Sequence, residues 1–269
     1  MKASDIAIGV SMALLALLIS YILVSGGLGP VAPFDVRPLA KAYLNYTYNP
    51  QFVWFSALSP EAVTAIVWDF RGLDTYFETS VLFIAIVGVV ALLRGANIVR
   101  GLGSQGLSLI VKASTRIVTP LILIAGISLA FHGHLSPGGG FQGGSFMTVA
   151  MALIAVAFSI EFLEERKLSI NRLLAIRVAG LLGIVATSIA LLIAALAVGG
   201  YAYIFQNMIR IGSTLSMPSW FLDRPLGGIL FFLNLSESIA VVGGLTLGVV
   251  LLLLRDEEIK RVIGGEEHE

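Results

Sequence analysis

The sequence predicts an all-helical, polytopic integral membrane protein with about six transmembrane helices. Of its 269 residues, 57% are apolar and only 13% are charged, and the mean hydropathy is +0.92, which is far above the values of soluble domains. The apolar residues form continuous runs without the period-two alternation of a transmembrane barrel, so helices are favoured. The balance of 17 basic and 17 acidic residues excludes the charge signature of a nucleic-acid-binding protein.

Six apolar runs reach the roughly 20 residues that a helix needs to cross a bilayer core. They cover about residues 6–24, 74–93, 116–131, 141–160, 173–198 and 226–254. The first run is longer than the apolar part of a usual signal peptide, and no clear cleavage pattern follows it, so we expect a retained helix. The connections at 26–60 and 199–225 are rich in proline and aromatic residues, and the second one favours an interfacial helix.

The basic residues predict the orientation, because cytoplasmic loops carry more lysine and arginine. With the six spans above, 12 basic residues fall on one side: Lys2, Arg94, Arg100, Lys112, Arg116, Arg166, Lys167, Arg172, Arg177, Arg255, Lys260 and Arg261. The other side has five: Arg37, Lys41, Arg71, Arg210 and Arg224. Both termini are therefore predicted to be cytoplasmic.

Charged residues enter the second apolar run. Four charged residues lie immediately before or inside it: Asp69, Arg71, Asp74 and Glu78. A charged side chain at membrane depth is tolerated where it forms an ion pair, contacts water or lies on an ion pathway. On a helix, Arg71, Asp74 and Glu78 share one face and Asp69 points elsewhere. We expect Arg71 to keep Asp74 ionised and the deeper Glu78 to exchange protons. The alternative is a helix-entry cluster at the interface, stabilised by the helix dipole.

Another acid, Glu237, lies about ten residues into the sixth run, which places it near mid-membrane. With Asn234 and Ser238 it forms a polar patch on the helix. This patch either lines a water path or bonds a neighbouring helix, and both interpretations stay open.

The turn between the third and fourth runs, from His132 to Gly144, is rich in glycine. It lacks the Gly-Lys-Ser/Thr ending of a phosphate-binding loop, so nucleotide binding is excluded. His132 and His134 have no third local ligand and no cysteine nearby, so a metal site is disfavoured and proton relay or backbone capping is preferred. Glycines at small-xxx-small spacing predict close helix packing; they are Gly139, Gly140, Gly143, Gly144, Gly244 and Gly248.

Two motifs resemble parts of a known family of membrane complexes. The run from Thr115 to Gly144, with its His-Gly-His-Leu-Ser-Pro-Gly-Gly-Gly-Phe-Gln-Gly-Gly sequence, closely resembles MrpB, also called MnhB, of the multisubunit Mrp-type sodium/proton antiporters. The run from Ala65 to Glu78 resembles the C-terminal part of MrpA, the large antiporter subunit; in archaeal membrane-bound hydrogenases this part is a separate small protein. The resemblance predicts a fusion of an MrpA-like segment, residues 1–100, with an MrpB-like domain, residues 101–269.

The resemblance carries over to particular residues. The MrpA motif matches Asp69, Arg71, Gly72, Asp74, Thr75 and Glu78. This chain departs from the family at Phe77, where glycine is usual, and it offers Asn234 and Glu237 where MrpB tends to carry an aspartate.

The resemblance implies a membrane subunit of a cation/proton antiporter module, with Na⁺ and H⁺ as the transported ions, in the cytoplasmic membrane. The predicted ion-translocation candidates are Asp69, Arg71, Asp74, Glu78, His132, His134 and Glu237. The implied partners are other Mrp-type subunits and a hydrogenase-like or complex I-like redox module. Because the chain has no cysteine, iron–sulfur or nickel centres belong to partner subunits.

Two other function classes remain to be weighed. A purely structural scaffold would use the same polar residues to close contacts between helices. An intramembrane enzyme lacks support, because no nucleophile is paired recognisably with a base.

Overall fold

Among the residues that the structure describes, six helices are long and apolar enough to cross a membrane, as the sequence predicts. A computed structural model describes residues 3–27, 36–92, 106–159, 162–163, 168–218, 220–221 and 223–252. The predicted boundary near residue 100 lies outside these ranges. So do eight of the basic residues used for the orientation: Lys2, Arg94, Arg100, Arg166, Lys167, Arg255, Lys260 and Arg261.

The chain divides into two compact units, Met1–Tyr43 and Leu44–Glu269. The first unit contains α1 (Ala3–Val24) and the start of α2 (Pro38–Thr47). Helix α1 is apolar on all sides, and none of its 18-residue window is buried within this chain. A helix that is apolar all round is suited to lipid or to the helices of other chains.

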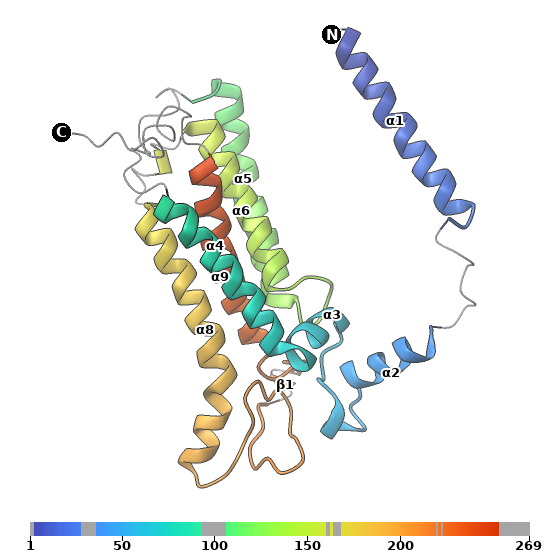
Figure 1. Ribbon diagram of the computed structural model, residues 1–269, viewed down its shortest axis with the longest axis vertical. Coiled ribbons are helices and arrows are strands. Elements are labelled where there is room, and N and C mark those ends of the chain that lie inside the picture. Colours follow the sequence, from blue (N-terminus) through green and yellow to red (C-terminus); the bar gives the residue numbers. More distant parts are fainter. Residues whose placement is uncertain are drawn as a thin grey trace, which may run out of the picture. The chain divides into compact units, whose positions relative to one another are not determined.

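The second unit is a helical bundle, built from α4 (Gly72–Leu92), α5 (Leu109–His132), α6 (Gly140–Phe158), α8 (Ile170–Ala197) and α9 (Leu230–Leu252). Helix α9 packs against α6, α8 and α4, and α5 packs against α6 (Figure 1). Helix α9 has the most buried window of the six, at 56%. The site described below is therefore built around α9.

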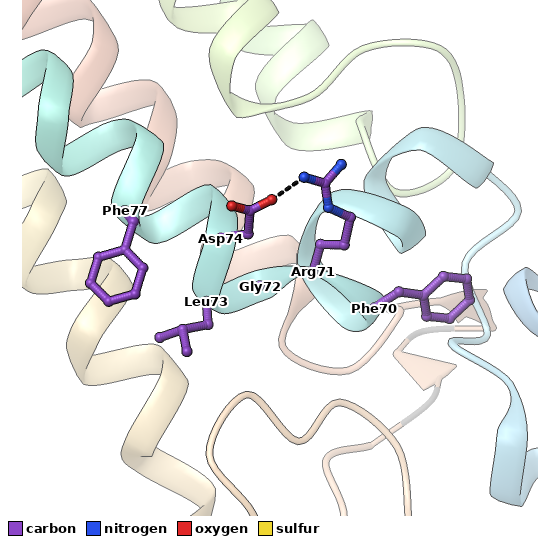
Figure 2. A pocket seen from close by; sticks show the side chains of 6 residues that line it. All are labelled: Phe70, Arg71, Gly72, Leu73, Asp74 and Phe77. Carbon is purple, nitrogen blue, oxygen red and sulfur yellow. Dashed lines mark hydrogen bonds and ion pairs between the residues drawn. The ribbon is translucent and has the colours of Figure 1, made fainter.

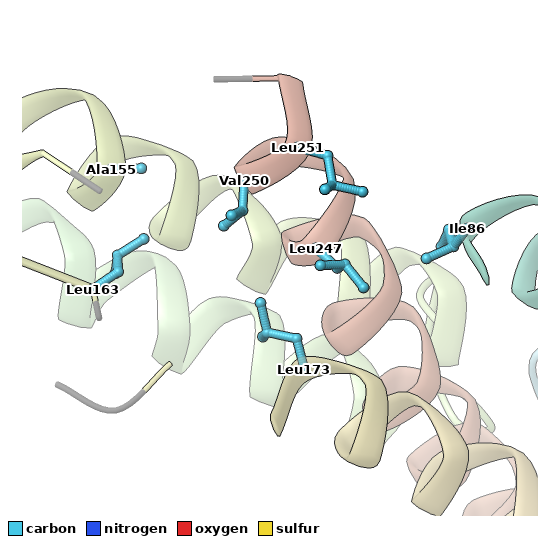
Figure 3. Close-up of a cluster of buried hydrophobic side chains, with 7 residues drawn as sticks. All are labelled: Ile86, Ala155, Leu163, Leu173, Leu247, Val250 and Leu251. Carbon is cyan, nitrogen blue, oxygen red and sulfur yellow. The ribbon is translucent and has the colours of Figure 1, made fainter. Parts of the chain in front are cut away.

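The end of α9 lies in an apolar cluster. Leu247, Val250 and Leu251 pack there with Ile86 of α4 and Leu173 of α8, together with Ala155 and Leu163 (Figure 3). These apolar contacts hold the ends of α4, α8 and α9 together.

Two predicted helix boundaries are shifted. Helix α5 begins at Leu109 and not near Arg116, because Ser108 caps it by accepting a hydrogen bond from the Val111 amide. Helix α9 begins at Leu230 and not at Leu226. Gly227 and Gly228 have φ of +63° and +61°, a left-handed conformation that a helix cannot continue through.

The predicted interfacial helix at 199–225 is wrong for the described part of this segment. These residues form turns and a two-stranded antiparallel ribbon of β1 (Trp220–Phe221) and β2 (Arg224–Pro225). Gly199 and Gly212 adopt φ of +74° and +85°, which interrupts any helical run. The segment is tied to the bundle by Asn207, whose side chain donates to Ala57 O and accepts from the Ile229 amide.

A short broken helix precedes α4. It begins as α3 (Ala62–Thr64) and continues directly as the π-helical turn η2 (Ala65–Phe70), and a separate 3-10 turn, η1 (Val53–Phe55), lies earlier in the chain. The Arg71 amide donates to Ile66 O, five residues back, and the Thr75 hydroxyl donates to Val67 O at 2.6 Å. Such wide turns are frequent at functional sites.

Candidate functional site

A polar cavity of about 250 Å³ lies where η2, α4, the glycine-rich turn, α6 and α9 meet. Its wall includes the backbone of Gly138–Gly140 and six polar side chains: Thr64, Thr75, Glu78, Gln142, Asn234 and Glu237. Of the candidates that the sequence predicts, this cavity brings together Glu78 and Glu237. The carboxylate, amide and hydroxyl oxygens of such a wall are the ligands that hard monovalent and divalent cations prefer.

Glu237 forms the closed side of the cavity. It lies on α9 about 10 Å from the start of the helix, closer to the helix end than the sequence predicts, and it is 7% exposed. Its carboxylate accepts a hydrogen bond from the backbone N–H of Phe141, in the first turn of α6, and faces the indole of Trp68. The amide and the dipole of α6 both favour negative charge at this position.

Gly140 makes this approach possible. A Cβ added there would lie 2.5 Å from Glu237 Oε2 and 2.6 Å from Glu237 Cβ, and it would also meet the Asn234 carbonyl. Since side chains do not approach so closely, only glycine lets the start of α6 reach Glu237.

Glu78 forms the open side. It lies on α4, is exposed in this chain, and is close enough to Glu237 for the two carboxylates to interact electrostatically. Two acids on one small cavity repel each other when both are ionised, and a bound cation or proton relieves that repulsion.

Asn234 lies one turn before Glu237 on α9. Its side-chain oxygen accepts a hydrogen bond from the Trp68 indole at 3.2 Å. Its side-chain nitrogen is buried and has no hydrogen-bond partner among the described residues. Because buried amides are normally paired, this nitrogen indicates an interaction with water or another group in the cavity.

The predicted cluster around Arg71 is divided by the structure. Arg71 and Asp74 form an ion pair, as expected, and their side chains point toward one another beside Phe70 and Phe77 (Figure 2). They line a separate, open pocket of about 430 Å³ that does not include Glu78. Asp74 and Glu78 are four residues apart on the regular helix α4, so they lie on one face as the spacing predicts, but they line different pockets.

Asp69 points away from this cluster, as predicted, and pairs with a residue that sequence reasoning missed. Arg210, from the segment after α8, donates to both carboxylate oxygens of Asp69 at 2.7 and 2.8 Å. The Asp69 side chain is 1% exposed. Burial raises the pKa of Asp69, and the Arg210 guanidinium acts against this rise. The pair joins η2 to the segment after α8, and Arg210 also donates to Trp54 O.

The two histidines do not line the cavity. His132 is exposed and its Nδ1 lies 3.1 Å from Ser128 O. His134 is 4% exposed, and its Nε2 lies 3.2 Å from Pro225 O. A carbonyl only accepts, so Nε2 carries the proton and His134 is the structural donor at this contact. Within the described ranges, no group of three or more His, Cys, Asp or Glu side chains could hold a metal ion.

Burial lowers the pKa of His134 below its ordinary value of 6.5. The folded chain therefore binds fewer protons than the unfolded chain as the pH falls through 6.5, and its stability decreases on acidification. We expect the melting temperature of the full chain in detergent to fall between pH 7.5 and pH 5. His134→Gln, which retains a donor but does not titrate, should reduce that fall. An equal fall in both proteins would contradict the assignment.

Of the six glycines identified in the sequence, Gly140, Gly143, Gly144 and Gly244 pack helices within this chain. Gly144 meets Val241 and Ser238 O of α9, and Gly143 meets Gly126 O and Ala130 of α5. Gly244 contacts Ile86 and Arg177, whereas Gly248 has no heavy atom within 4 Å of an added Cβ. Three glycines that the sequence analysis did not name, Gly180, Gly183 and Gly243, hold α8 and α9 together.

The structure also corrects the placement of Arg177. The orientation argument put it in a cytoplasmic loop, but it lies inside α8 and is fully buried. The signal was present in the sequence, because Arg177 falls within the fifth apolar run.

The membrane-length helices of the described residues define this chain as a multi-pass membrane protein. Residues 110–247, just over half of the chain, match the family model described as a domain related to the MnhB subunit of Na⁺/H⁺ antiporters. The chain belongs to this family, as its glycine-rich turn predicts.

Relatives and solved structures agree with this assignment. An uncharacterized protein of Methanocaldococcus jannaschii is 26% identical over 236 residues, covering 77% of this chain and 82% of the relative. A chain of the membrane-bound sulfane sulfur reductase, an archaeal respiratory membrane complex, is 28% identical with a TM-score of 0.64, covering 92% of this chain and 98% of that one. A chain of the Mrp complex from Dietzia sp. DQ12-45-1b has the same fold, with 17% identity and a TM-score of 0.58 over 95% of this chain and 26% of that one.

Proposed function

We propose that this chain is a membrane subunit of a multisubunit cation/proton antiporter module that exchanges Na⁺ and H⁺, and that the cavity between η2, α4, α6 and α9 binds the transported ion. The observation that carries the proposal is the pair of carboxylates, Glu78 and Glu237, on one polar cavity. The family and the solved complexes support the role as one component of a larger complex.

The chemistry follows from the two carboxylates. Glu237 is buried at the start of α6, where its carboxylate meets the Phe141 amide and the helix dipole, and Glu78 adds a second carboxylate at the open side. One Na⁺ or one H⁺ neutralises the excess charge, so the two ions compete for the same place. The neutral oxygens of Thr64, Thr75 and Gln142 complete a set of ligands for Na⁺.

Neutral substitutions test this proposal. We expect Glu237→Gln and Glu78→Gln each to lower Na⁺/H⁺ exchange by the native complex in proteoliposomes by at least about tenfold, because a loss of about 1.4 kcal/mol of ion stabilisation is tenfold. The matched control is Asp74→Asn, which removes an exposed acid of α4 that does not line the cavity. Unchanged exchange in the Glu237→Gln complex, with all subunits present, would overturn the proposal.

A structural scaffold is the second candidate function. It is favoured by the close glycine contacts, which join α6 and α8 to α9. If the chain is a scaffold, the same glutamine variants should cause subunits to dissociate from the complex. Complexes that remain intact should then exchange Na⁺ and H⁺ at the normal rate. Quantifying the subunits of each purified variant by mass spectrometry separates the two functions.

A second part of the proposal concerns which complex contains this chain. The likeness to a chain of the sulfane sulfur reductase favours a redox-driven complex in the cytoplasmic membrane, in which residues 1–100 are the MrpA-like segment. Iron–sulfur or nickel centres and any catalytic activity would then belong to partner subunits, since this chain has no cysteine. Mild extraction followed by mass spectrometry and iron analysis tests this. Antiporter subunits with iron proteins mean a redox-driven pump, and antiporter subunits alone mean a secondary antiporter.

A further inference from the structure

Arg177 is a buried cation at the centre of the bundle that the proposed ion site does not use. It lies on α8 with 0% exposure. One guanidinium nitrogen donates to Ala240 O of α9 and another to Thr79 O of α4, each at 2.7 Å. Its Nε has no hydrogen-bond partner among the described residues.

The charge of Arg177 is compensated only partly. An arginine side chain stays protonated in proteins, and here the contacts are backbone carbonyls and no carboxylate of the described residues forms an ion pair with it. Glu237 interacts with it electrostatically. Since carbonyl dipoles offset less than a full charge, Arg177 projects a positive potential toward the cavity. A buried charge inside membrane helices is generally functional.

Arg177 lies directly beyond the cavity along the bundle. On α4 the cavity ends at Glu78, and Arg177 bonds the next residue, Thr79. On α9 the cavity ends at Glu237, and Arg177 bonds Ala240 and contacts Gly244, three and seven residues farther along. The apolar cluster of Ile86, Leu247 and Val250 follows (Figure 3).

The order along the bundle is therefore an acidic cavity, then a fixed cation, then the cluster of apolar side chains. A cation that reaches Glu237 meets a positive charge in a region of low dielectric constant, where repulsion is strong. Arginine side chains exclude cations and protons from membrane pores in this way.

We propose that Arg177 is a fixed cationic barrier that closes the inner end of the cavity, so that a cation bound at Glu237 cannot cross the bundle through this chain. The cavity is then closed at its inner end, and ions enter and leave by the open side at Glu78. This inference rests on the proposed ion site, but separate experiments test the ion site and the barrier. Loss of the ion site lowers coupled exchange, and loss of the barrier raises uncoupled leak.

Passive leak tests the barrier. We expect Arg177→Met, in the native complex in proteoliposomes, to raise downhill ²²Na⁺ flux without energy input by at least about tenfold, because one buried charge is removed from the path. Arg177→Gln, which keeps a donor for one carbonyl, should do the same. Arg177→Lys should stay tight, and the matched control is Arg172→Met, on the exposed start of α8. If an assembled Arg177→Met or Arg177→Gln complex showed no increase in passive ²²Na⁺ flux, the proposal of a barrier would be wrong.

A second measurement leaves Arg177 unchanged. The chain has no cysteine, so single cysteines report access directly. A cationic methanethiosulfonate reagent should modify Gln142→Cys, in the cavity, and should not modify Thr246→Cys, which replaces a buried residue beyond Arg177. Equal modification of both positions would overturn the barrier. If Glu237→Gln also retains exchange, the ion site itself fails.

Discussion

Asp69→Ala is expected to destabilise the folded chain by about 3 kcal/mol, because it leaves the Arg210 guanidinium without its carboxylate in a largely buried place. Asp69 is 1% exposed and accepts two hydrogen bonds from Arg210. The pair joins η2 to the segment after α8, so its loss also removes one of the contacts that hold this segment, although Asn207 still anchors it. At about 2–4 °C for each kcal/mol in a chain of this size, the melting temperature of the purified chain should fall by about 6–12 °C.

Asp74→Ala is the matched control for Asp69→Ala. Asp74 also pairs with an arginine, but the two side chains are 61% and 51% exposed, and exposed ion pairs contribute about 0–1 kcal/mol. We expect a change of about 4 °C or less in melting temperature. If both variants melted at the same temperature, the Asp69–Arg210 pair would not hold the segment. Arg210→Met should repeat the Asp69→Ala result, since it removes the other half of the same pair.

Gly140→Ala is expected to impair both stability and exchange. The added Cβ would overlap Glu237 and the Asn234 carbonyl, and the carbonyl belongs to helical backbone that cannot turn away. Overpacking of this kind costs about 1–3 kcal/mol. The start of α6 must move away from α9, which withdraws the Phe141 amide from Glu237. Na⁺/H⁺ exchange by the native complex should therefore fall with the melting temperature.

Gly248→Ala provides the comparison for Gly140→Ala. An alanine Cβ at Gly248 meets no heavy atom of this chain within 4 Å, and alanine is favoured over glycine inside a helix by about 1 kcal/mol. We expect unchanged or slightly raised stability and unchanged exchange. An equal loss in both variants would mean that the close approach of α6 to α9 is not what positions Glu237.

The membrane helices were predictable from the sequence because hydropathy acts residue by residue. A bilayer requires about 20 apolar residues in a helix, and all six such runs form helices. The segment at 199–225 was mispredicted as helical, because its aromatic and basic residues fit an interfacial helix as well as a looped segment. Its form depends on Gly199 and Gly212 and on anchors such as Asn207, which bonds Ala57 far away in the chain.

The site was predictable only in part. Glu237 and Glu78 stand out because a charge in an apolar run is costly, and each was identified from its own neighbours in sequence. The helical spacing of Arg71, Asp74 and Glu78 did not show that Arg71 and Asp74 line one pocket and Glu78 another. Which cavity a side chain lines depends on the elements packed around it, and these come from distant parts of the chain.

The sequence by itself determined that this chain is a six-helix membrane protein of the MnhB-related family, because hydropathy and the glycine-rich turn are local properties. Only the tertiary structure decided which charges meet. Glu237 lies at the start of α6, close to Glu78. Asp69 pairs with Arg210, and Arg177 donates hydrogen bonds to backbone carbonyls of α4 and α9. These contacts join residues from distant parts of the chain, and their geometry depends on how closely glycines let the helices approach.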